Sequence, residues 1–286
     1  MAAIVRPDPR WIIGKHALMN VRAVRRRGRT EMDPHSWRIP YQWQGCHYQD
    51  NDDQPFLLLI NSGGGFVEGD VAELHVTLEP QTRALVTTTA ASKFYKCEGG
   101  GVSRELADFD VGDGATLEYC PDESIPFARA KVERRTHIRL KKTSRLFATD
   151  MLAAGRVHHL RGEAFAFDML DSEFRVSLEG EPLAIDRVMA FDRDEVAALR
   201  RLWDGCSHSA TVIAYAEDLP EGIEAEVEKA LDAAPARAAG TSRSGPLLTC
   251  RILADEAWAC HEAVFACWRA LRPAIAGKPA RPVRKC

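Results

Sequence analysis

Apolar and polar residues alternate along much of the chain between about residues 56 and 190. In the segment 72–79 the apolar residues occupy even positions and the polar residues odd positions, which is typical of a strand with one buried face. The turn residues 80–82 separate this segment from the β-branched run 84–89, which predicts a second strand. Together the two segments form a unit of strand, tight turn and strand.

This unit recurs further along the chain, the last time more weakly, at 109–119, 138–149 and 174–185. Val76, Phe109 and Ile138 hold corresponding positions about 30 residues apart. A repeat of this length indicates strands stacked in layers, as in a solenoid, rather than a closed barrel. We therefore predict a mainly β protein with a stacked-strand, β-helix or solenoid-like core. The repeats are few and degenerate, so independent hairpins remain an alternative.

The helical part is small and lies in the C-terminal half. Apolar stripes at helical spacing predict helices over about 192–204, 220–233 and 255–272. Asp192 and Glu195 resemble a capping box at the start of the first helix. Pro273 is expected to end the last one, because proline breaks the hydrogen-bond ladder of a helix.

We expect one domain over residues 1–286, with a β core at about 10–190 and 206–219. The segment 233–245 is rich in Ala, Gly, Ser and Pro, which predicts a flexible loop. The tail 277–282 is predicted to be extended or disordered.

The charge balance argues against nucleic acid and membrane surfaces as partners. The 38 Lys and Arg residues face 41 Asp and Glu residues, a net charge of −3. The longest strongly apolar run, 56–60, has five residues, whereas a membrane-spanning helix needs about 20. Prolines interrupt the N-terminal segment where a signal peptide would be apolar. We therefore expect a cytoplasmic protein whose eight cysteines are free thiols.

The glycine-rich segment 62–70 follows an apolar run and has the glycine spacing of a phosphate-binding loop between Gly64 and Gly69. Asp70 stands where that loop needs a lysine, and its carboxylate would repel a phosphate. The residues that follow alternate as a strand, so no helix N-terminus would face the ligand. The segment therefore predicts a tight connection that needs positive φ angles.

The histidines and cysteines form no recognisable metal or catalytic motif. His158 and His159 are adjacent and are expected to lie exposed in a loop. Cys260, His261 and Cys267 share the apolar face of the last predicted helix, which is typical of core positions. A Gly-x-Ser-x-Gly motif is also missing from the sequence. Residue chemistry alone therefore favours a binding or assembly protein over an enzyme.

Five blocks of the sequence resemble the urease accessory protein family UreD, also called UreH. They are the segments 63–70, 88–96 and 117–127, Gly155-Arg156 with Gly162-Glu163, and 268–273. Glu68 and Cys120 depart from the family pattern of a glycine and a leucine at these positions. The family motif positions in this chain are Gly63, Gly64, Gly65, Gly69, Asp70, Lys93, Tyr95 and Arg156.

The resemblance implies a mostly β stack of strands with a small helical part, and a non-enzymatic metallochaperone scaffold. Such a protein binds apo-urease and, with UreF and the GTPase UreG, enables GTP-dependent insertion of nickel, with UreE as the indirect nickel donor. It implies no tightly bound cofactor, only nickel in transit through a polar tunnel. Oxygen ligands that hold nickel weakly would suit such a path, and the candidates are Asp70, Glu118 and Asp150. Ordinary turn or strand-edge carboxylates are the alternative interpretation of these three residues, and Lys93 and Tyr95 are expected to hold the glycine loop in place.

Two other functions remain open at this point. One is a metal-dependent enzyme on a β scaffold that uses His75, His137 and His158. The other is a diverged paralogue that matures a different metalloenzyme.

Overall fold

The strands form two facing sheets in the computed structural model, which describes residues 14–50, 52–159, 162–283 and 285. The first sheet has seven strands in the order β15-β14-β12-β9-β6-β1-β2. Its strands are β1 (His16–Arg26), β2 (Arg29–Arg38), β6 (Val71–Leu78), β9 (Ser103–Val111), β12 (Lys131–Leu140), β14 (Met169–Leu178) and β15 (Glu181–Ala190).

The second sheet has eleven strands, with the main order β17-β18-β16-β13-β10-β7-β5-β3. These strands are β3 (Tyr41–Gln42), β5 (Pro55–Asn61), β7 (Arg83–Thr88), β10 (Thr116–Tyr119), β13 (Arg145–Ala153), β16 (His208–Tyr215), β17 (Ala238–Ser244) and β18 (Leu247–Ala254). Three short strands extend it: β4 (His47–Tyr48), β8 (Ser92–Phe94) and β11 (Ser124–Pro126).

Between β5 and β14 the chain passes back and forth between the two sheets, and each new strand pairs in parallel with the previous strand of its own sheet. The predicted repeat is confirmed by the pairing register, which aligns Val76 with Phe109, Phe109 with Ile138 and Ile138 with Val176. The first three tight turns link strands of different sheets, so they are the corners of a solenoid rather than hairpins. The fourth unit differs, because β14 and β15 pair as an antiparallel hairpin.

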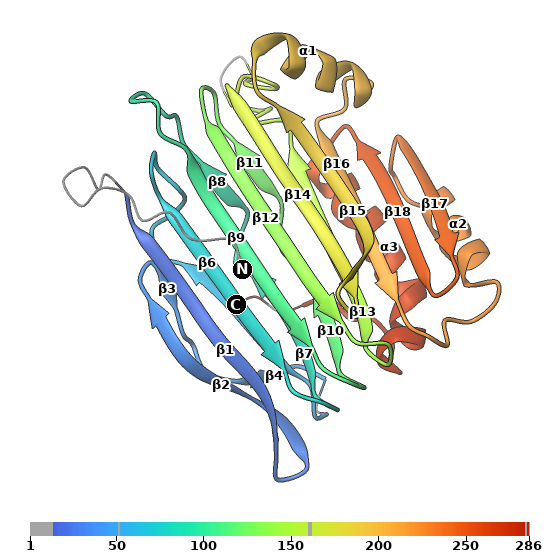
Figure 1. Cartoon of the computed structure of the whole chain (residues 1–286). Coiled ribbons are helices and arrows are strands. Elements are labelled where there is room, and N and C mark those ends of the chain that lie inside the picture. The colour runs from blue at the N-terminus through green and yellow to red at the C-terminus, as the bar shows by residue number, and fades with distance from the viewer. Residues whose placement is uncertain (1–13, 51, 160–161, 284, 286) are drawn as a thin grey trace.

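Side chains that point between the sheets form the main core. In the parallel strands of the seven-stranded sheet every second residue is buried, such as Leu74, Val76 and Leu78 in β6. The front sheet of Figure 1, from blue β1 to yellow β15, covers one side of this core.

A second apolar core lies on the other face of the eleven-stranded sheet, where α2 (Ile223–Asp232) and α3 (Ala257–Ala276) pack (Figure 1). The cysteines of α3 belong to this core, and Cys260 and Cys267 are buried free thiols. Of the helices in the described residues, none is long and apolar enough to cross a bilayer.

The helix α1 (Arg193–Leu202) begins as the sequence predicts. The side chain of Asp192 accepts a hydrogen bond from the backbone N–H of Glu195 at 2.9 Å, and the Glu195 carboxylate accepts one from the N–H of Phe191. These reciprocal bonds satisfy N–H groups that a helix start leaves unpaired.

Two boundary predictions in the C-terminal part are wrong. Helix α3 continues through Pro273 to Ala276 and ends at Gly277, whose φ is +71°. Burial of Leu271, Arg272 and Ile275 anchors this last turn, and tertiary packing of this kind overrides the local effect of proline.

The predicted loop 233–245 contains β17, an edge strand that pairs antiparallel with β18. Most side chains of β17 are exposed on both faces, so its sequence carries no alternation to detect. The described residues of the tail, 277–283 and 285, form neither helix nor strand. Lys278 fixes the start of this tail by ion pairs to Asp50 and Asp52.

Candidate functional site

A charged cluster interrupts the apolar core between the two sheets. Glu105 of β9 and Arg134 of β12 are register partners in the seven-stranded sheet, and Asp150 faces them from β13. Arg134 donates from Nε to Glu105 Oε2 at 3.0 Å, and its two terminal nitrogens contact the two carboxylate oxygens of Asp150 at 2.8 and 3.2 Å. Ser92 donates to the other oxygen of Glu105, and Ser172 accepts from Arg134. We call Glu105, Arg134 and Asp150 the inter-sheet triad.

Burial makes this cluster electrostatically strong. Burial alone would lower the pKa of Arg134, but Asp150 and Glu105 outweigh it and raise that pKa, so the guanidinium stays charged. Two carboxylates then face one guanidinium, which leaves an excess of one negative charge in the triad. Burial and the charge of Glu105 also raise the pKa of the Tyr119 phenol, which stays protonated. The cluster is therefore suited to a cation.

Two small cavities adjoin the triad. The larger has a volume of about 80 Å³ and extends from Gly64 and Lys93 to Glu105. The smaller, of about 10 Å³, borders Arg134, Tyr119 and Asp122. Both are lined by the same five residues where they meet: Tyr41, Leu59, Thr88, Ser92 and Glu105. A cavity of about 80 Å³ with polar groups in its wall can hold water, so the carboxylate of Glu105 borders room for ordered water.

The glycine loop forms one wall of the larger cavity. Gly64, Gly65 and Gly69 have φ angles of +73°, +145° and +81°, as the predicted tight connection requires. A Cβ on Gly65 would lie 2.6 Å from both the carbonyl oxygen of Lys93 and the ring of Tyr95. Asp70 is buried and caps the loop, because its two oxygens accept from the backbone N–H groups of Lys15 and Val67.

The block around Lys93 contacts this loop through its backbone. The carbonyl oxygen of Lys93 accepts from the N–H of Phe66 at 2.7 Å, and the N–H of Tyr95 donates to the carbonyl of Phe66. The Tyr95 hydroxyl also donates to the carbonyl of Gly64. Arg156 lies elsewhere, paired with Glu163 and 4.2 Å from the centre of the Phe127 ring.

Glu118 lies on the opposite face of the eleven-stranded sheet from Asp150. It is fully buried against α3, where it accepts from Trp268 Nε1 at 2.5 Å and from Arg272 Nε at 2.9 Å. Gln54 Nε2 donates to its second oxygen at 2.8 Å. The structure therefore places the three candidates Asp70, Glu118 and Asp150 in three separate environments.

Sequence reasoning missed Glu105 and Arg134, although a signal was present. Both occupy inward positions of alternating strands, between Ser103 and Ala107 in β9 and between Val132 and Thr136 in β12. A charged residue at an inward position must find a buried partner. The identity of that partner depends on the stacking register.

The three histidines of the enzyme alternative do not converge. His75 pairs with Glu73, His137 contacts Ser177, and His158 is exposed in a loop and pairs with Glu256. Within the described part of the chain, the side chains close enough to share a metal ion are a different set: Asp122, Glu123 and His261.

Comparisons with known proteins identify the family. The family model described as UreD urease accessory protein matches residues 15–285. The chain belongs to the UreD family. The urease accessory protein UreD of Enterobacter sp. (strain 638) is 29% identical over 273 residues, which cover 87% of this chain and 95% of that protein. The UreD proteins of Pseudomonas paraeruginosa and Klebsiella pneumoniae are each 32% identical over more than three quarters of both chains.

The structure explains why the blocks that resemble UreD occur together. Glu118 of the block 117–127 holds Trp268 and Arg272 of the block 268–273, although 150 and more residues separate them. The glycine loop likewise pairs with the block 88–96. These contacts thus join four of the five UreD blocks in pairs, and membership in this family supports a role in urease maturation.

Proposed function

We propose that the chain is a non-enzymatic scaffold in urease maturation. It binds apo-urease, UreF and the GTPase UreG in the cytoplasm, and the complex inserts nickel in a GTP-dependent step with UreE as the indirect donor. Membership in the UreD family supports this role. The glycine loop also fits a scaffold, because the Asp70 carboxylate occupies the backbone N–H of Val67 in the loop and that of Lys15. Nucleotide hydrolysis is then left to a partner.

The observation that carries the nickel part of this proposal is the inter-sheet triad beside its two cavities. Carboxylate oxygens accept nickel, and the excess negative charge of the triad attracts a cation. Arg134 keeps both carboxylates hydrogen-bonded and lowers their affinity for a metal. Such a site would pass nickel on instead of storing it.

We therefore propose that Asp150 and Glu105 contact nickel along its path. We propose structural roles for the other two sequence candidates, since Asp70 caps the glycine loop and Glu118 is held by Arg272 and Trp268.

The test combines a pull-down with a measurement of urease activation. The tagged chain is coexpressed with UreF, UreG and the urease subunits, as wild type and with Asp150→Asn and Glu105→Gln together. We expect both forms to recover the complex and the variant to reduce urease activation about tenfold or more. The matched control is Asp110→Asn, which removes a carboxylate paired with Arg139 on the outer face of the same sheet.

Full activation by a variant that recovers the complex contradicts the nickel path. Recovery of the wild-type chain without urease contradicts the scaffold role and favours a paralogue that serves another metalloenzyme.

A further inference from the structure

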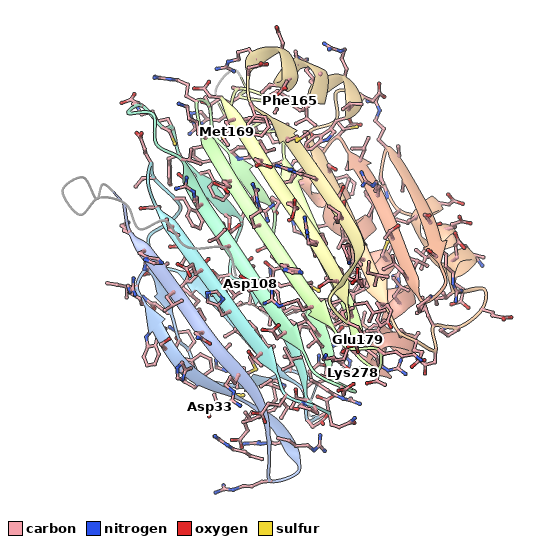
Figure 2. The ribbon with its side chains drawn as sticks, viewed as in Figure 1. Asp33, Asp108, Phe165, Met169, Glu179 and Lys278 are labelled. Carbon is pink, nitrogen blue, oxygen red and sulfur yellow. The ribbon has the colours of Figure 1, made fainter. Side chains whose placement is uncertain are left out.

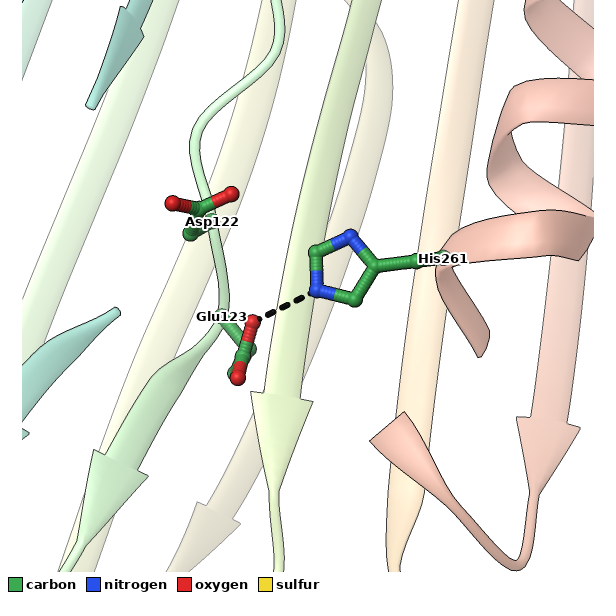
Figure 3. Close-up of side chains that lie close together, drawn as sticks. All are labelled: Asp122, Glu123 and His261. Carbon is green, nitrogen blue, oxygen red and sulfur yellow. Dashed lines mark hydrogen bonds and ion pairs between the residues drawn. The ribbon is translucent and has the colours of Figure 1, made fainter. Parts of the chain in front are cut away.

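A second group of ligand side chains lies outside the inter-sheet triad. Asp122 and Glu123 precede β11, and His261 reaches toward them from α3 (Figure 3). One ligand atom from each residue lies within 4.8 Å of the other two, and His261 Nε2 is 2.8 Å from Glu123 Oε2. First-row ions bind such atoms at about 2.0–2.2 Å, so two ligands of one ion lie at most about 4.4 Å apart. Shifts of a few tenths of an ångström would close the group around an ion.

The backbone that carries the two carboxylates is fixed. The N–H of Asp122 donates to Thr88 Oγ1 at 2.9 Å, and the carbonyl of Glu123 accepts from the N–H of Ser92 at 2.9 Å. His261 comes from a separate element, the second turn of α3. The donors are therefore held in place from two sides, as a metal site requires.

We propose that Asp122, Glu123 and His261 bind one divalent first-row transition-metal ion. One imidazole nitrogen and two carboxylate oxygens are a donor set for nickel, cobalt or zinc, and two carboxylates balance the charge of the ion. Most of each carboxylate is buried, while His261 is about two-fifths exposed, so an ion can enter from the side of α3.

A lysine contacts one carboxylate of this site. Lys285 Nζ forms an ion pair with Asp122 Oδ1, and His261 contacts Glu123, so both carboxylates already hold cationic or proton-donating groups. Lys285 belongs to the tail that follows α3, where the described residues form neither helix nor strand. An arriving metal ion would displace its ammonium from Asp122. The tail therefore competes with the metal.

The position of the site connects it to the interior. Asp122 also lines the smaller cavity, which borders Arg134 and Glu105 of the inter-sheet triad. A metal held by Asp122, Glu123 and His261 would thus lie at the α3 side of that cavity. This position suits a site where nickel enters the protein. That role rests on the proposed function, whereas metal binding at the site does not.

The experiment is a calorimetric titration of the full-length chain, purified without a polyhistidine tag and stripped of metal, with Ni²⁺ and separately with Zn²⁺. We expect one equivalent to bind, with affinity reduced about tenfold or more by His261→Gln and raised several-fold by Lys285→Ala. His158→Gln is the matched control, since His158 contacts Glu256 at the same 2.8 Å distance but belongs to no group of three ligands among the described residues.

The proposed site is wrong if the wild type and His261→Gln bind the metal ion with equal affinity, or if the wild type shows no saturable binding. No gain of affinity in Lys285→Ala would overturn the competition by the tail. Urease activation in cells separates the metal site from the proposed function. If His261→Gln loses metal binding but still activates urease fully, the site does not take part in nickel delivery. If the wild-type chain activates urease but binds no metal at Asp122, Glu123 and His261, the proposed site is wrong and the proposed function is unaffected.

Discussion

At the scale of single residues, the buried carboxylates differ in what their oxygens contact. Among the described residues, those of Asp70 accept from backbone N–H groups, those of Glu118 accept from side chains of α3 and Gln54, and those of Asp150 accept from the guanidinium of Arg134. A carboxylate whose partners come from the fold itself stabilises the fold. Asp150 instead contacts Arg134, which lines the smaller cavity together with Glu105.

The pair Glu118–Arg272 predicts a large loss of stability on neutralisation. Arg272 is 2% exposed, and Glu118→Gln leaves Asp50 as its remaining carboxylate partner. Removal of one partner of a buried ion pair costs about 3–5 kcal/mol, and the remaining contact to Asp50 sets the expectation at about 3 kcal/mol. Chemical denaturation monitored by circular dichroism measures this loss in the free energy of unfolding.

The matched control for this variant is Glu217→Gln, which removes the carboxylate of an exposed ion pair with Lys142 at 3.0 Å. Exposed pairs contribute about 0–1 kcal/mol, so this variant should unfold at nearly the wild-type denaturant concentration. A loss for Glu118→Gln as small as that of the control would show that the buried pair does not hold α3 against the sheet.

At the scale of elements, charged residues on the outer face of the seven-stranded sheet link neighbouring strands. Asp171 of β14 holds Arg135 of β12 on one side and Arg187 of β15 on the other. Figure 2 shows such side chains along the whole face, with Asp108 near its middle. Parallel strands stacked by a solenoid cannot be joined by short hairpins, so contacts of this kind add to the pairing between layers.

Asp171→Asn should therefore cost about 1–3 kcal/mol at pH 7. Burial raises the pKa of Asp171, but the hydrogen bonds from Arg187 and Arg135 outweigh it, and the net pKa in the folded protein is lowered. The folded state thus binds fewer protons than the unfolded state, whose aspartate pKa is about 3.9. The contribution is fully present above that value and is lost as the pH falls through the lower folded pKa.

Urea denaturation of the wild type and Asp171→Asn between pH 7 and pH 3 checks this expectation. The difference in free energy of unfolding should stay constant down to about pH 5 and shrink below about pH 4. A difference that stays the same across the whole range would mean that the carboxylate charge of Asp171 does not stabilise the sheet.

At the scale of the whole molecule, two cores share the eleven-stranded sheet, whereas the described residues place a core on one side of the seven-stranded sheet. Its edge strand β15 carries Ile185 and Met189, which are 50% and 54% exposed. Exposed apolar residues at a sheet edge favour association with other chains. We therefore expect the chain to aggregate when expressed alone and to become soluble with its partners.

Ile185→Lys with Met189→Lys should raise the soluble fraction of the chain expressed alone and leave its thermal midpoint unchanged. Val188→Lys is the control, because Val188 packs partly buried against the core and a lysine there should lower the midpoint. A monodisperse wild-type chain at high yield, or a double variant that aggregates as the wild type does, would contradict the expectation.

The local pattern was enough to predict much of this architecture. Alternation and the 30-residue repeat determine the stacked strands, since a strand buried on one face must present every second residue to the core. The capping residues Asp192 and Glu195 likewise determine the start of α1, because their contacts lie within one helical turn. The glycine loop needed positive φ angles for the same local reason.

Only the tertiary structure decided which charges meet. Glu105, Arg134 and Asp150 come from three strands in two sheets, and Asp122, Glu123 and His261 from a loop and α3. Their encounters depend on the stacking register and on how α3 packs against the sheet, which no local pattern encodes. The exposed strand β17 was hidden for a related reason, since it is held by backbone pairing with β18 and by contacts with α2, and its side chains carry no signal of burial.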